Sequence, residues 1–339
     1  MSHRLPAPIG ILDEHPDWSR RLFAELEQRQ LPFERIDHAR HTFDPRDRAR
    51  PYSVVVNRTS PSSHTRGHAD VLFYAEALLD HYAGLRIPVI NPVAAYRFEK
   101  SKALQASLLE RLGVNYPRAV VVNHPSQIRK ALERVRFPLV VKANVGGSGA
   151  GIVRFDSRDE LDASLDQIDL GPDRTALVQE YIESEDGAIV RVEVLDDRYL
   201  YAIRIVRQAD AGFNLCPADI CQTPPAMPGA HAPAAVAPAA TRVTPELSSC
   251  PADAGGRPGL SVTAFDAPVE AVETALRIAR AAHIDVGGIE YMVNRSDGRA
   301  YFYDVNATSN FVANAPAVLG FDPTALFADY IERRALAGV

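Results

Sequence analysis

An apolar run that ends in a lysine and leads into a glycine-rich loop is the feature that most constrains the fold of this chain. Residues 138–141 read Pro-Leu-Val-Val, Lys142 follows, and a second apolar pair stands at 152–153. The loop between the two runs contains Gly146, Gly147, Ser148 and Gly149. Glycines let backbone N–H groups come close to an anion, and a lysine adds a point charge beside it. The pattern therefore predicts two strands joined by a phosphate-sized loop, unlike a P-loop, which leads into a helix.

The composition is that of an ordinary soluble chain with room for two or three domains. It has 339 residues, of which 46% are hydrophobic and 24% charged, and its formal net charge is −6. An acidic balance argues against a nucleic-acid-binding surface. Because no apolar run reaches membrane-spanning length and no signal-peptide core follows Met1, we expect a cytoplasmic protein with no membrane partner.

The three cysteines do not form a recognisable motif. They are Cys216, Cys221 and Cys250, an odd number without the spacing of a disulfide framework. No histidine or further cysteine stands near enough to complete a zinc site. We therefore expect reduced thiols.

Strand-like and helix-like segments alternate over residues 1–97. Short apolar strands are expected at 9–12, 33–36, 52–57 and 88–90, and amphipathic helices at 17–29 and 68–82. Such alternation predicts a small α/β domain with a parallel, doubly wound sheet.

The rest of the chain predicts further strands and helices and one irregular segment. Helices are expected at 101–112, 125–134 and 269–282, and strands at 117–122, 139–142, 177–179, 189–195, 200–206, 288–293 and 300–305. Residues 223–260 hold eight of the 25 prolines and show no hydrophobic period. We interpret them as a flexible surface insertion.

Two acids near the C-terminus fall on the two strands of one predicted hairpin. Glu290 and Asp304 lie on either side of the turn at 295–298, so they can face one another. Asn306 stands two residues past Asp304, on the same face of its strand. Carboxylate and amide oxygens around one point suit Mg²⁺ bound to phosphates, whereas solvated hairpin positions are the simpler interpretation of either acid taken alone.

An extended segment between these two regions can hold an adenine ring. Glu180 would accept a hydrogen bond from the adenine amino group, and backbone groups at Tyr181 and Ile182 would pair with the ring edge. A simple edge strand is the alternative.

In their order along the chain, these pieces resemble the ATP-grasp superfamily, and in particular the RimK-like carboxylate–amine ligases. The resemblance implies an ATP-grasp fold preceded by the small α/β domain, with a central subdomain at 98–180 and a C-terminal subdomain at 181–339. It matches Lys102, with Lys100 as competitor, and Lys142 to the two nucleotide lysines, and the loop at 146–149 to the cover over the phosphates. The hinge is then Glu180 with Tyr181 and Ile182.

The same resemblance supplies the remaining site residues. Arg191 and Arg204 match arginines that face the phosphates or the substrate, and Glu290, Asp304 and Asn306 match the metal ligands. Three positions depart from the family pattern. Ile189 stands where an aspartate is usual, Asp304 replaces the commoner glutamate, and residues 306–311 lack the proline-glycine that often follows the asparagine.

The implied activity is formation of an amide or peptide bond from a carboxylate and an amine, through an acylphosphate made from ATP. The resemblance implies ATP with two Mg²⁺ ions, which Mn²⁺ can replace, and an amino acid, small peptide or peptide terminus as substrate. Arg191 and Arg204 would stabilise the transferring group. Kinase-like or carboxylating chemistry, and a nucleotide-binding module without catalysis, are the alternatives.

Two further expectations concern the first domain and the assembly. Arg58 follows the third predicted strand, at the edge of the sheet where ligands bind in open α/β folds, and it could clamp a substrate carboxylate. A solvated loop arginine is the competing interpretation. A homodimer is the default expectation for an enzyme of this kind.

Overall fold

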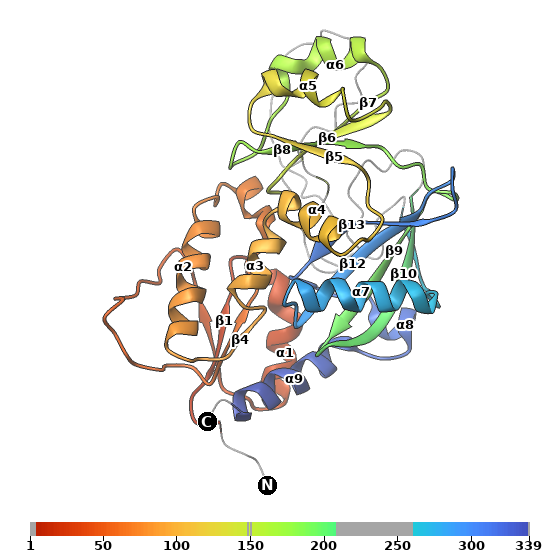
Figure 1. The fold of residues 1–339 in the computed structure, drawn as a ribbon. Helices are drawn as coiled ribbons and strands as arrows, with labels where there is room; N and C mark the ends of the chain where they lie inside the picture. The colour runs from red at the N-terminus through yellow and green to blue at the C-terminus, as the bar shows by residue number, and fades with distance from the viewer. Residues whose placement is uncertain (1–4, 148, 150, 208–259, 338–339) are drawn as a thin grey trace, which may run out of the picture.

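The computed structural model describes residues 5–147, 149, 151–207 and 260–337, which form three sheets (Figure 1). Ser148, the three cysteines and all but the last residue of the predicted insertion at 223–260 lie outside the described residues. In the part of the chain that the structure describes, no helix is long and apolar enough to cross a membrane.

The first sheet is parallel, as the alternating pattern predicts. Its strands, in the order β2-β1-β3-β4, are β1 (Ile9–Leu12), β2 (Phe33–Ile36), β3 (Val54–Asn57) and β4 (Val89–Ile90). Side chains alternate between the two faces of β3. Val54 and Val56 pack in one core with α1 (Arg20–Gln28), and Val55 packs in another with α2 (Val71–Gly84).

The last helix of the chain belongs to this first domain in space. Helix α9 (Pro323–Ala337) contacts α1 and β3 (Figure 1). Its Phe327 and Ile331 are buried in the same core as Leu22 and Leu26 of α1. The two ends of the chain therefore close one face of the parallel sheet together.

The second sheet is antiparallel and carries the lysine and the glycine loop. Its strands run in the order β5-β8-β6-β7: β5 (Ala119–Val122), β6 (Leu139–Ala143), β7 (Ile152–Phe155) and β8 (Ala176–Glu180). Short helices α5 (Ile128–Ala131) and α6 (Arg158–Ser164) cover its outer face (Figure 1). The helix expected at 125–134 is only α5 preceded by the 3₁₀ turn η3 (Pro125–Gln127). A proline at the start of η3 fits the first position of a helical turn.

The third sheet is a five-stranded antiparallel layer. Its order is β11-β10-β9-β12-β13, from β9 (Ala188–Leu195), β10 (Arg198–Arg207), β11 (Leu260–Ala264), β12 (Val286–Val293) and β13 (Ala300–Asn306). Helix α7 (Val269–Ala281) covers one face together with α4 (Lys102–Arg111). Helix α3 (Val93–Glu99) precedes α4, and α8 (Ala315–Leu319) follows β13.

Helix α4 joins the third sheet by pairing with its edge. The Gln105 side chain donates to the carbonyl of Val305 at 2.9 Å and accepts from the Val305 N–H at 3.2 Å. This amide therefore satisfies backbone groups that edge strand β13 would otherwise leave open. The contact fixes the first residue of α4, Lys102, beside the end of β13.

Asn91, which directly follows β4, connects the first sheet to the third in a similar way, through hydrogen bonds from its side chain to backbone groups. Its amide donates to the carbonyls of Val286 (2.7 Å) and Ala307, and its oxygen accepts from the N–H groups of Asp285 (2.8 Å) and Val286 (3.2 Å). Its φ of 52° lies in the left-handed region, which asparagine tolerates better than most residues.

We predict that Asn91→Ala lowers the free energy of unfolding by about 3 kcal/mol, because several buried backbone groups lose their partners at once. Urea denaturation followed by circular dichroism measures this change. The matched control is Asn123→Ala, an exposed asparagine directly after β5, which should change stability by less than about 0.5 kcal/mol. Equal effects of the two substitutions would contradict the role assigned to Asn91.

Candidate active site

The two hairpin acids lie directly opposite each other, in one row with an arginine. Glu290 of β12 pairs with Asp304 of β13 on one side and with Arg191 of β9 on the other. The next row along the same strands contains Glu193, Gly288 and Asn306. The sequence-based expectation that Glu290 and Asp304 face one another is thus confirmed by the strand register.

A β-bulge in β13 brings a tyrosine to the same row. Glu290 is opposite Asp304 and Tyr291 is opposite Phe302, so Tyr303 is an extra residue in its strand. Bulges turn a side chain away from strict alternation. The Tyr303 hydroxyl consequently reaches Glu290 and donates to its Oε2 at 2.9 Å.

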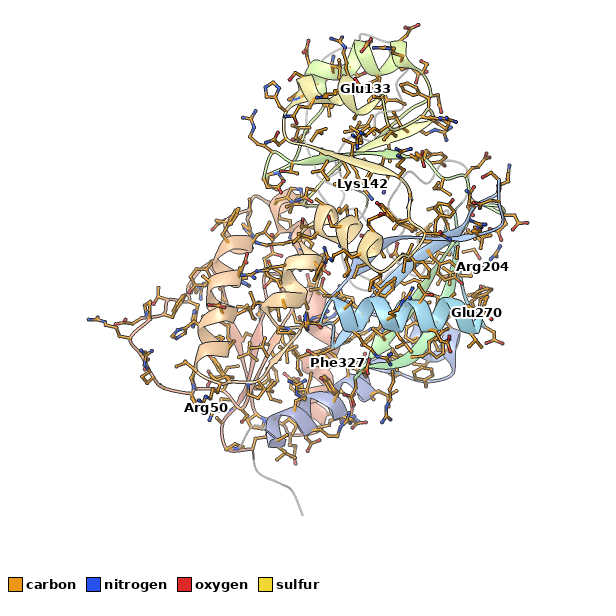
Figure 2. The ribbon with its side chains drawn as sticks, viewed as in Figure 1. Arg50, Glu133, Lys142, Arg204, Glu270 and Phe327 are labelled. Carbon is orange, nitrogen blue, oxygen red and sulfur yellow. The ribbon has the colours of Figure 1, made fainter. Side chains whose placement is uncertain are left out.

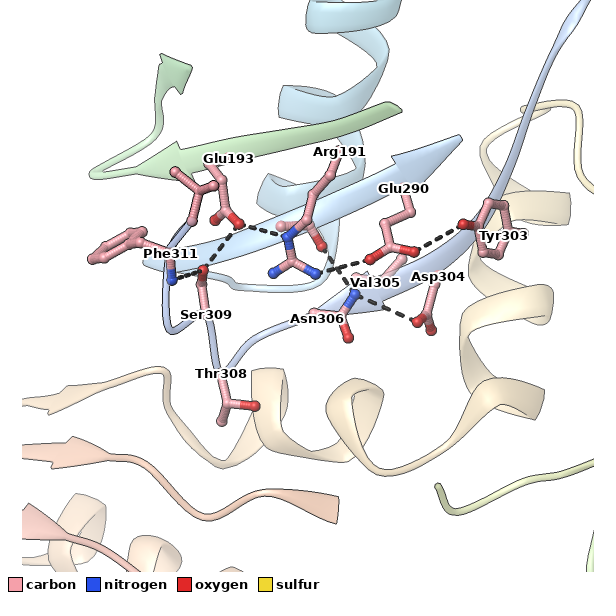
Figure 3. A network of polar contacts seen from close by, with 12 residues as sticks. Arg191, Glu193, Glu290, Tyr303, Asp304, Val305, Asn306, Thr308, Ser309 and Phe311 are labelled. Carbon is pink, nitrogen blue, oxygen red and sulfur yellow. Dashed lines mark hydrogen bonds and ion pairs between the residues drawn. The ribbon is translucent and has the colours of Figure 1, made fainter. Parts of the chain in front are cut away.

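A buried network of charges connects these residues (Figure 3). Arg191 donates from Nη1 to Glu290 Oε1 at 2.9 Å and from Nε to Glu193 Oε1 at 2.5 Å. Burial raises the pKa of Glu290, and Arg191 opposes that rise. Burial disfavours the charged form of Arg191, but the charges of Glu193 and Glu290 outweigh it and raise the pKa of the guanidinium. Arg191 therefore stays charged on this face of the sheet.

A glycine makes room for that guanidinium. A Cβ placed on Gly288 would lie 2.3 Å from three atoms of the Arg191 guanidinium, which is far inside van der Waals contact. Gly287, its neighbour, would bring a Cβ to 2.2 Å from the Asn306 carbonyl oxygen. The Gly287-Gly288 pair thus lets Arg191 and β13 lie close against the backbone of β12.

Lys102, rather than Lys100, reaches the acids. Lys102 Nζ lies 2.9 Å from Asp304 Oδ1, whereas Lys100 pairs with Glu76 of α2. Burial tends to raise the pKa of Asp304, but the charges of Lys102 and Lys142 outweigh it and hold that pKa below its usual value. The Ser101 hydroxyl caps α4 by accepting from the Leu104 N–H, which fixes the helix start that carries Lys102.

Lys142 reaches the same place from β6 of the second sheet. It is 6% exposed, and Figure 2 shows it on the side of that sheet that faces the third sheet. Burial, reinforced by the charge of Lys102, lowers its pKa to about 7. Among the described residues no hydrogen bond or ion pair engages its amine. A second lysine, whose amine has no partner among the described residues, therefore lies near Lys102 and Asp304.

Asn144 ties the two lysine-bearing elements together. Its Oδ1 accepts from the Ala103 N–H at 2.8 Å and from the Ser101 hydroxyl at 3.0 Å, and its carbonyl accepts from the Lys102 N–H at 3.2 Å. Because Asn144 follows directly after β6, the start of α4 and the end of β6 are held in one register.

The glycine loop lies against the first domain. A Cβ on Gly147 would lie 3.3 Å from Cβ of Ser62, in the 3₁₀ turn η2 (Pro61–Arg66) that follows β3. Gly149 has a φ of 75° and Gly151 a φ of 71°, which favour glycine at both positions. Gly146, Gly147 and Gly149 thus follow Lys142 in a turn between β6 and β7, as the sequence predicts.

The predicted adenine segment lies at the end of β8. Glu180, Tyr181 and Ile182 are all partly buried. The N–H of Tyr181 donates to the carbonyl of Pro138 at 3.0 Å, so this one of the backbone groups expected to pair with adenine is already engaged. No partner for the Ile182 N–H occurs among the described residues. The Tyr181 ring stacks with the guanidinium of Arg154, 4.2 Å from its centre.

Arg204 does not lie with the acids. It pairs with Val190, and Val190 packs on the α7 side of the third sheet, whereas Ile203, opposite Arg191, packs on the other side. Strand alternation therefore places Arg204 on the face opposite Glu290, where it binds Asp186 and lines a cavity of about 640 Å³ beside α7 (Figure 2). This placement corrects the predicted catalytic role of Arg204.

Arg58 is neither solvated nor free. It is 6% exposed, and it donates to the carbonyl of Ser309 at 2.7 Å and to the side chain of Asn310. Ser309 in turn donates to Glu193 Oε1 at 2.9 Å. Arg58 therefore connects the edge of the first sheet to the charge network through the segment after β13.

The donor set at the end of the hairpin fits Mg²⁺. Glu290 and Asp304 supply carboxylate oxygens and Asn306 an amide oxygen, the ligands that this ion prefers. In this structure the Asn306 NH₂ group lies 3.5 Å from Asp304 Oδ2, so the amide would have to turn to present its oxygen to a metal. Within the described ranges, no three His, Cys, Asp or Glu side chains gather as a metal site, so the Asn306 amide is needed to complete a set of three. Lys102 balances the charge of Asp304 in this structure, and a bound divalent cation would share that carboxylate.

Three residues of the site, Glu193, Tyr303 and Asn144, were not predicted from the sequence. Glu193 stands on β9 two positions after Arg191, and period-two alternation could have placed it on the same face. The bulge at Tyr303 and the junction at Asn144 leave no comparable pattern, since both depend on contacts between segments far apart in the chain.

Comparison with known proteins identifies the fold class. A RimK domain protein ATP-grasp from Sphaerobacter thermophilus aligns with a TM-score of 0.64 at 16% identity, over 96% of this chain and 99% of that one. D-alanine–D-alanine ligase from Bacillus anthracis, complexed with ATP, aligns with a TM-score of 0.63 at 15% identity, over 98% and 97%. The chain therefore has the ATP-grasp fold, preceded by a parallel α/β sheet, as expected.

A family model and curated relatives narrow the class. Residues 99–217 match the model of the RimK-like ATP-grasp domain, so this part of the chain is similar to RimK-like proteins. The probable alpha-L-glutamate ligase 1 of Shewanella denitrificans is 30% identical over 171 residues, which cover 46% of this chain and 57% of the relative. A probable alpha-L-glutamate ligase of Pseudoalteromonas translucida is 28% identical over 220 residues, 60% of this chain and 68% of the relative. The chain spans little more than half the length of the first curated relatives it matches.

We predict that Gly288→Ala lowers the free energy of unfolding by about 1–3 kcal/mol, because the new methyl group displaces the Arg191 guanidinium from its two carboxylates. Urea denaturation measures the change. Gly84→Ala is the matched control, since Gly84 ends helix α2 with open space around it, and there alanine should be neutral or stabilising by up to about 1 kcal/mol. A Gly288→Ala protein as stable as the parent would show that Arg191 is not held as described.

Proposed function

We propose that this protein is an ATP-dependent carboxylate–amine ligase that forms an amide or peptide bond through an acylphosphate. One observation carries the proposal: Lys102 from α4 and Lys142 from β6 converge on Asp304, beside the Glu290–Arg191 pair. Two lysines from different elements, a helix and a strand, and a set of oxygen ligands together complement the charges of a nucleoside triphosphate and its metal.

Each part of this arrangement has a role in the proposal. Lys102 and Lys142 bind phosphate oxygens, and the loop at 146–149 covers them. Glu290, Asp304 and Asn306 hold Mg²⁺, which neutralises charge on the phosphates when it is bound. The adenine ring lies at the hinge, where the N–H of Ile182 and the Glu180 side chain are available.

Arg191 is the residue we assign to the transferring group. It lies in the same row as Glu290 and Asp304, and its buried guanidinium keeps its charge. A fixed cation beside a developing negative charge stabilises a phosphoryl or acyl transition state without reorganising solvent. Arg204, on the opposite face of the sheet, has no part in this step.

The relatives guide the choice of substrates. Curated relatives are named as probable alpha-L-glutamate ligases, and the solved structures include a D-alanine–D-alanine ligase and the ATP-grasp ligase PsnB with a precursor peptide. We therefore propose an amino acid, a small peptide or a peptide terminus as the carboxylate and amine substrates. Two bound Mg²⁺ ions, replacement by Mn²⁺, a homodimer and a cytoplasmic location stay predictions from the sequence.

The test is a screen of the purified full chain with ATP, Mg²⁺ and pairs of the common L-amino acids and short peptides. We expect ADP and phosphate to form with at least one pair, together with a product of the mass of the amide. Hydroxylamine added without an amine should trap the acylphosphate as a hydroxamate. In the Asp304→Asn variant both products should fall by about 100-fold or more, because the metal set and the Lys102 partner change together.

Other outcomes separate the competing functions. ADP with a stable phosphorylated product and no hydroxamate indicates a kinase, and turnover that requires bicarbonate indicates a carboxylating enzyme. Nucleotide binding without turnover on any pair indicates a binding module. Each of these results would contradict the ligase proposal.

We also predict that ATP binding takes up a proton at alkaline pH. The Lys142 pKa is about 7, below the ordinary 10.5, so above pH 7 the amine is mostly neutral in the free protein, and phosphate binding favours its charged form. Uptake should approach about one proton per ATP near about pH 8 and vanish near about pH 6. Titration calorimetry in buffers of different ionisation enthalpy measures it.

Lys142→Arg supplies the control, because arginine remains charged throughout this range. The variant should bind ATP with no uptake attributable to this position. Equal uptake by parent and variant would exclude Lys142 as its source.

The lowered pKa of Lys142 also makes the free energy of unfolding depend on pH. The direction is opposite to that for a lysine whose pKa is raised by an acidic partner. Between pH 7 and 10.5 the unfolded chain holds a proton at Lys142 that the folded protein lacks, so the contribution of this residue to stability rises as the pH rises through that window.

A further inference from the structure

The cavity beside α7, which Arg204 lines, has no part in the proposed ligation. Its volume of about 640 Å³ lies within the range of about 300–1,000 Å³ that is usual for small-molecule sites. Strands β9, β10, β12 and β13, the helix α7 and the loop after α4 all contribute to its wall. The cavity is therefore a candidate binding site that the nucleotide site does not explain.

This cavity lies on the opposite face of the third sheet from the charge network. Val190 and Tyr291 line it, and each directly adjoins a residue of that network, Arg191 or Glu290. Successive side chains of a strand point to opposite faces, and Val190 and Tyr291 are buried in the core that α7 covers. A molecule in the cavity would thus lie against the strands that carry Arg191 and Glu290 without contact with the nucleotide.

The floor of the cavity, formed by Val190, Tyr291 and Phe302, is apolar and aromatic. Each of these residues is at most 7% exposed, and the rings of Tyr291 and Phe302 lie 5.2 Å apart between their centroids. Among the described residues no hydrogen bond engages the Tyr291 hydroxyl, and burial raises the pKa of this group to about 12. The floor therefore offers a contact surface for an apolar body and one neutral hydroxyl that can still donate.

Three arginines from separate elements reach the cavity: Arg204 from β10, Arg277 from α7 and Arg299 from the residue before β13 (Figure 2 labels Arg204). Arg204 pairs with Asp186, which also lines the cavity, so these two charges balance. Arg277 and Arg299 are exposed, and neither makes an ion pair with a described residue. Since Glu270 is the one other acid in the described lining, the cavity carries an excess of positive charge.

A small anion with an apolar body matches this lining. Guanidinium groups bind carboxylate and phosphate oxygens through pairs of parallel hydrogen bonds. An apolar body gains free energy when the floor removes it from water. A cation would instead be repelled by the two unpaired arginines, and a neutral molecule would leave both of them without a partner.

We propose that the cavity binds a small carboxylate or phosphate monoester through Arg277 and Arg299, with the apolar part of the molecule on Val190, Tyr291 and Phe302. This is a second site, occupied together with the nucleotide site. It does not depend on the ligase proposal, because no residue of the cavity belongs to the proposed nucleotide or metal site.

The test measures binding of probe anions to the full chain by NMR titration of the probe signals. The probes are 3-phenylpropionate, hexanoate and phenyl phosphate, and each has a neutral counterpart with the same body: 3-phenylpropanol, hexanol and phenol. We expect at least one anion to bind about 10-fold or more tightly than its counterpart, the effect of a charged hydrogen bond. Acetate and inorganic phosphate, which lack an apolar body, should bind at least about 10-fold more weakly than the tightest probe.

Variants show where the probe binds. The double variant Arg277→Gln/Arg299→Gln should lower the affinity for the tightest probe at least about 10-fold. Arg280→Gln/Arg295→Gln is the matched control, because Arg280 is exposed on α7 and Arg295 is exposed in the turn before β13, but neither lines the cavity. It should leave the affinity unchanged. Thr274→Trp keeps all four arginines and fills the cavity, so it should abolish binding.

Each outcome supports or overturns the inference. No binding of any probe, or equal binding of every anion and its neutral counterpart, would refute the site. Equal loss of affinity in the control pair and in the Arg277→Gln/Arg299→Gln variant would indicate general attraction to surface charge, which overturns the inference as well. Binding that ADP with Mg²⁺ abolishes, and that Arg277→Gln/Arg299→Gln leaves unchanged, would place the probe in the nucleotide site.

The test stays decisive if one variant is lost or if the ligase proposal fails. Circular dichroism shows whether each variant folds, and if Thr274→Trp does not, the two pairs of exposed arginine substitutions decide alone. Because every measurement is of probe binding, a parent protein without ligase activity would refute the ligase proposal and leave these results unaffected.

Discussion

The ion pair between Arg191 and Glu290, buried in the face of an antiparallel sheet, is the interaction on which the rest of the site depends. A charge removed from water must be matched by hydrogen bonds and opposite charge. Arg191 meets this condition with two carboxylates, one in its own row and one two residues along its strand. The glycine opposite Glu193 lets the guanidinium lie flat, and Tyr303 occupies the second oxygen of Glu290. If any one of these contacts is lost, a charged group stays buried in the low-dielectric interior without a partner.

The site also depends on the way the three sheets meet around α4. Gln105 holds this helix to β13, Asn144 holds its start to β6, and Asn91 holds the first sheet to β12. All three residues are amides that pair with backbone groups of another segment. Amides donate and accept at once, so each can replace a missing strand or helix partner. The result is that Lys102 and Lys142, from different elements, reach one acid.

Two kinds of site residue could be predicted from the sequence: those whose face follows from the alternation of side chains along a strand, and those that stand at the end of a strand. The opposition of Glu290 and Asp304 follows from the hairpin turn, and the position of Lys142 follows from the apolar run that ends there. The face of Arg204 could not be predicted in this way, because the register of β9 and β10 shifts by one residue between Tyr199 and Tyr201. Without this irregularity, Arg204 would pair with Ile189, on the same face as Arg191. The family resemblance placed Arg204 by sequence order, and strand pairing places it opposite Val190 instead.

Other features depend on contacts that no local pattern encodes. Whether Lys100 or Lys102 meets Asp304 depends on where α4 begins relative to β13, which Ser101 and Asn144 fix together. The bulge at Tyr303 adds one residue to a strand in which Tyr301, Phe302 and Tyr303 are three aromatic residues in a row, so the sequence does not mark which of them is the extra one. Helix α9 closes the first sheet from the far end of the chain, a pairing of segments about 300 residues apart.

The central claim is that a carboxylate is activated by phosphorylation at the point where Lys102, Lys142 and Arg191 meet. Transfer of oxygen from substrate to phosphate tests it most directly. The carboxylate substrate is labelled with ¹⁸O in both oxygens, and the phosphate released in the full reaction is analysed by mass spectrometry. An acylphosphate path predicts one ¹⁸O in each phosphate released. Phosphate that carries no label while the amide forms would contradict the account.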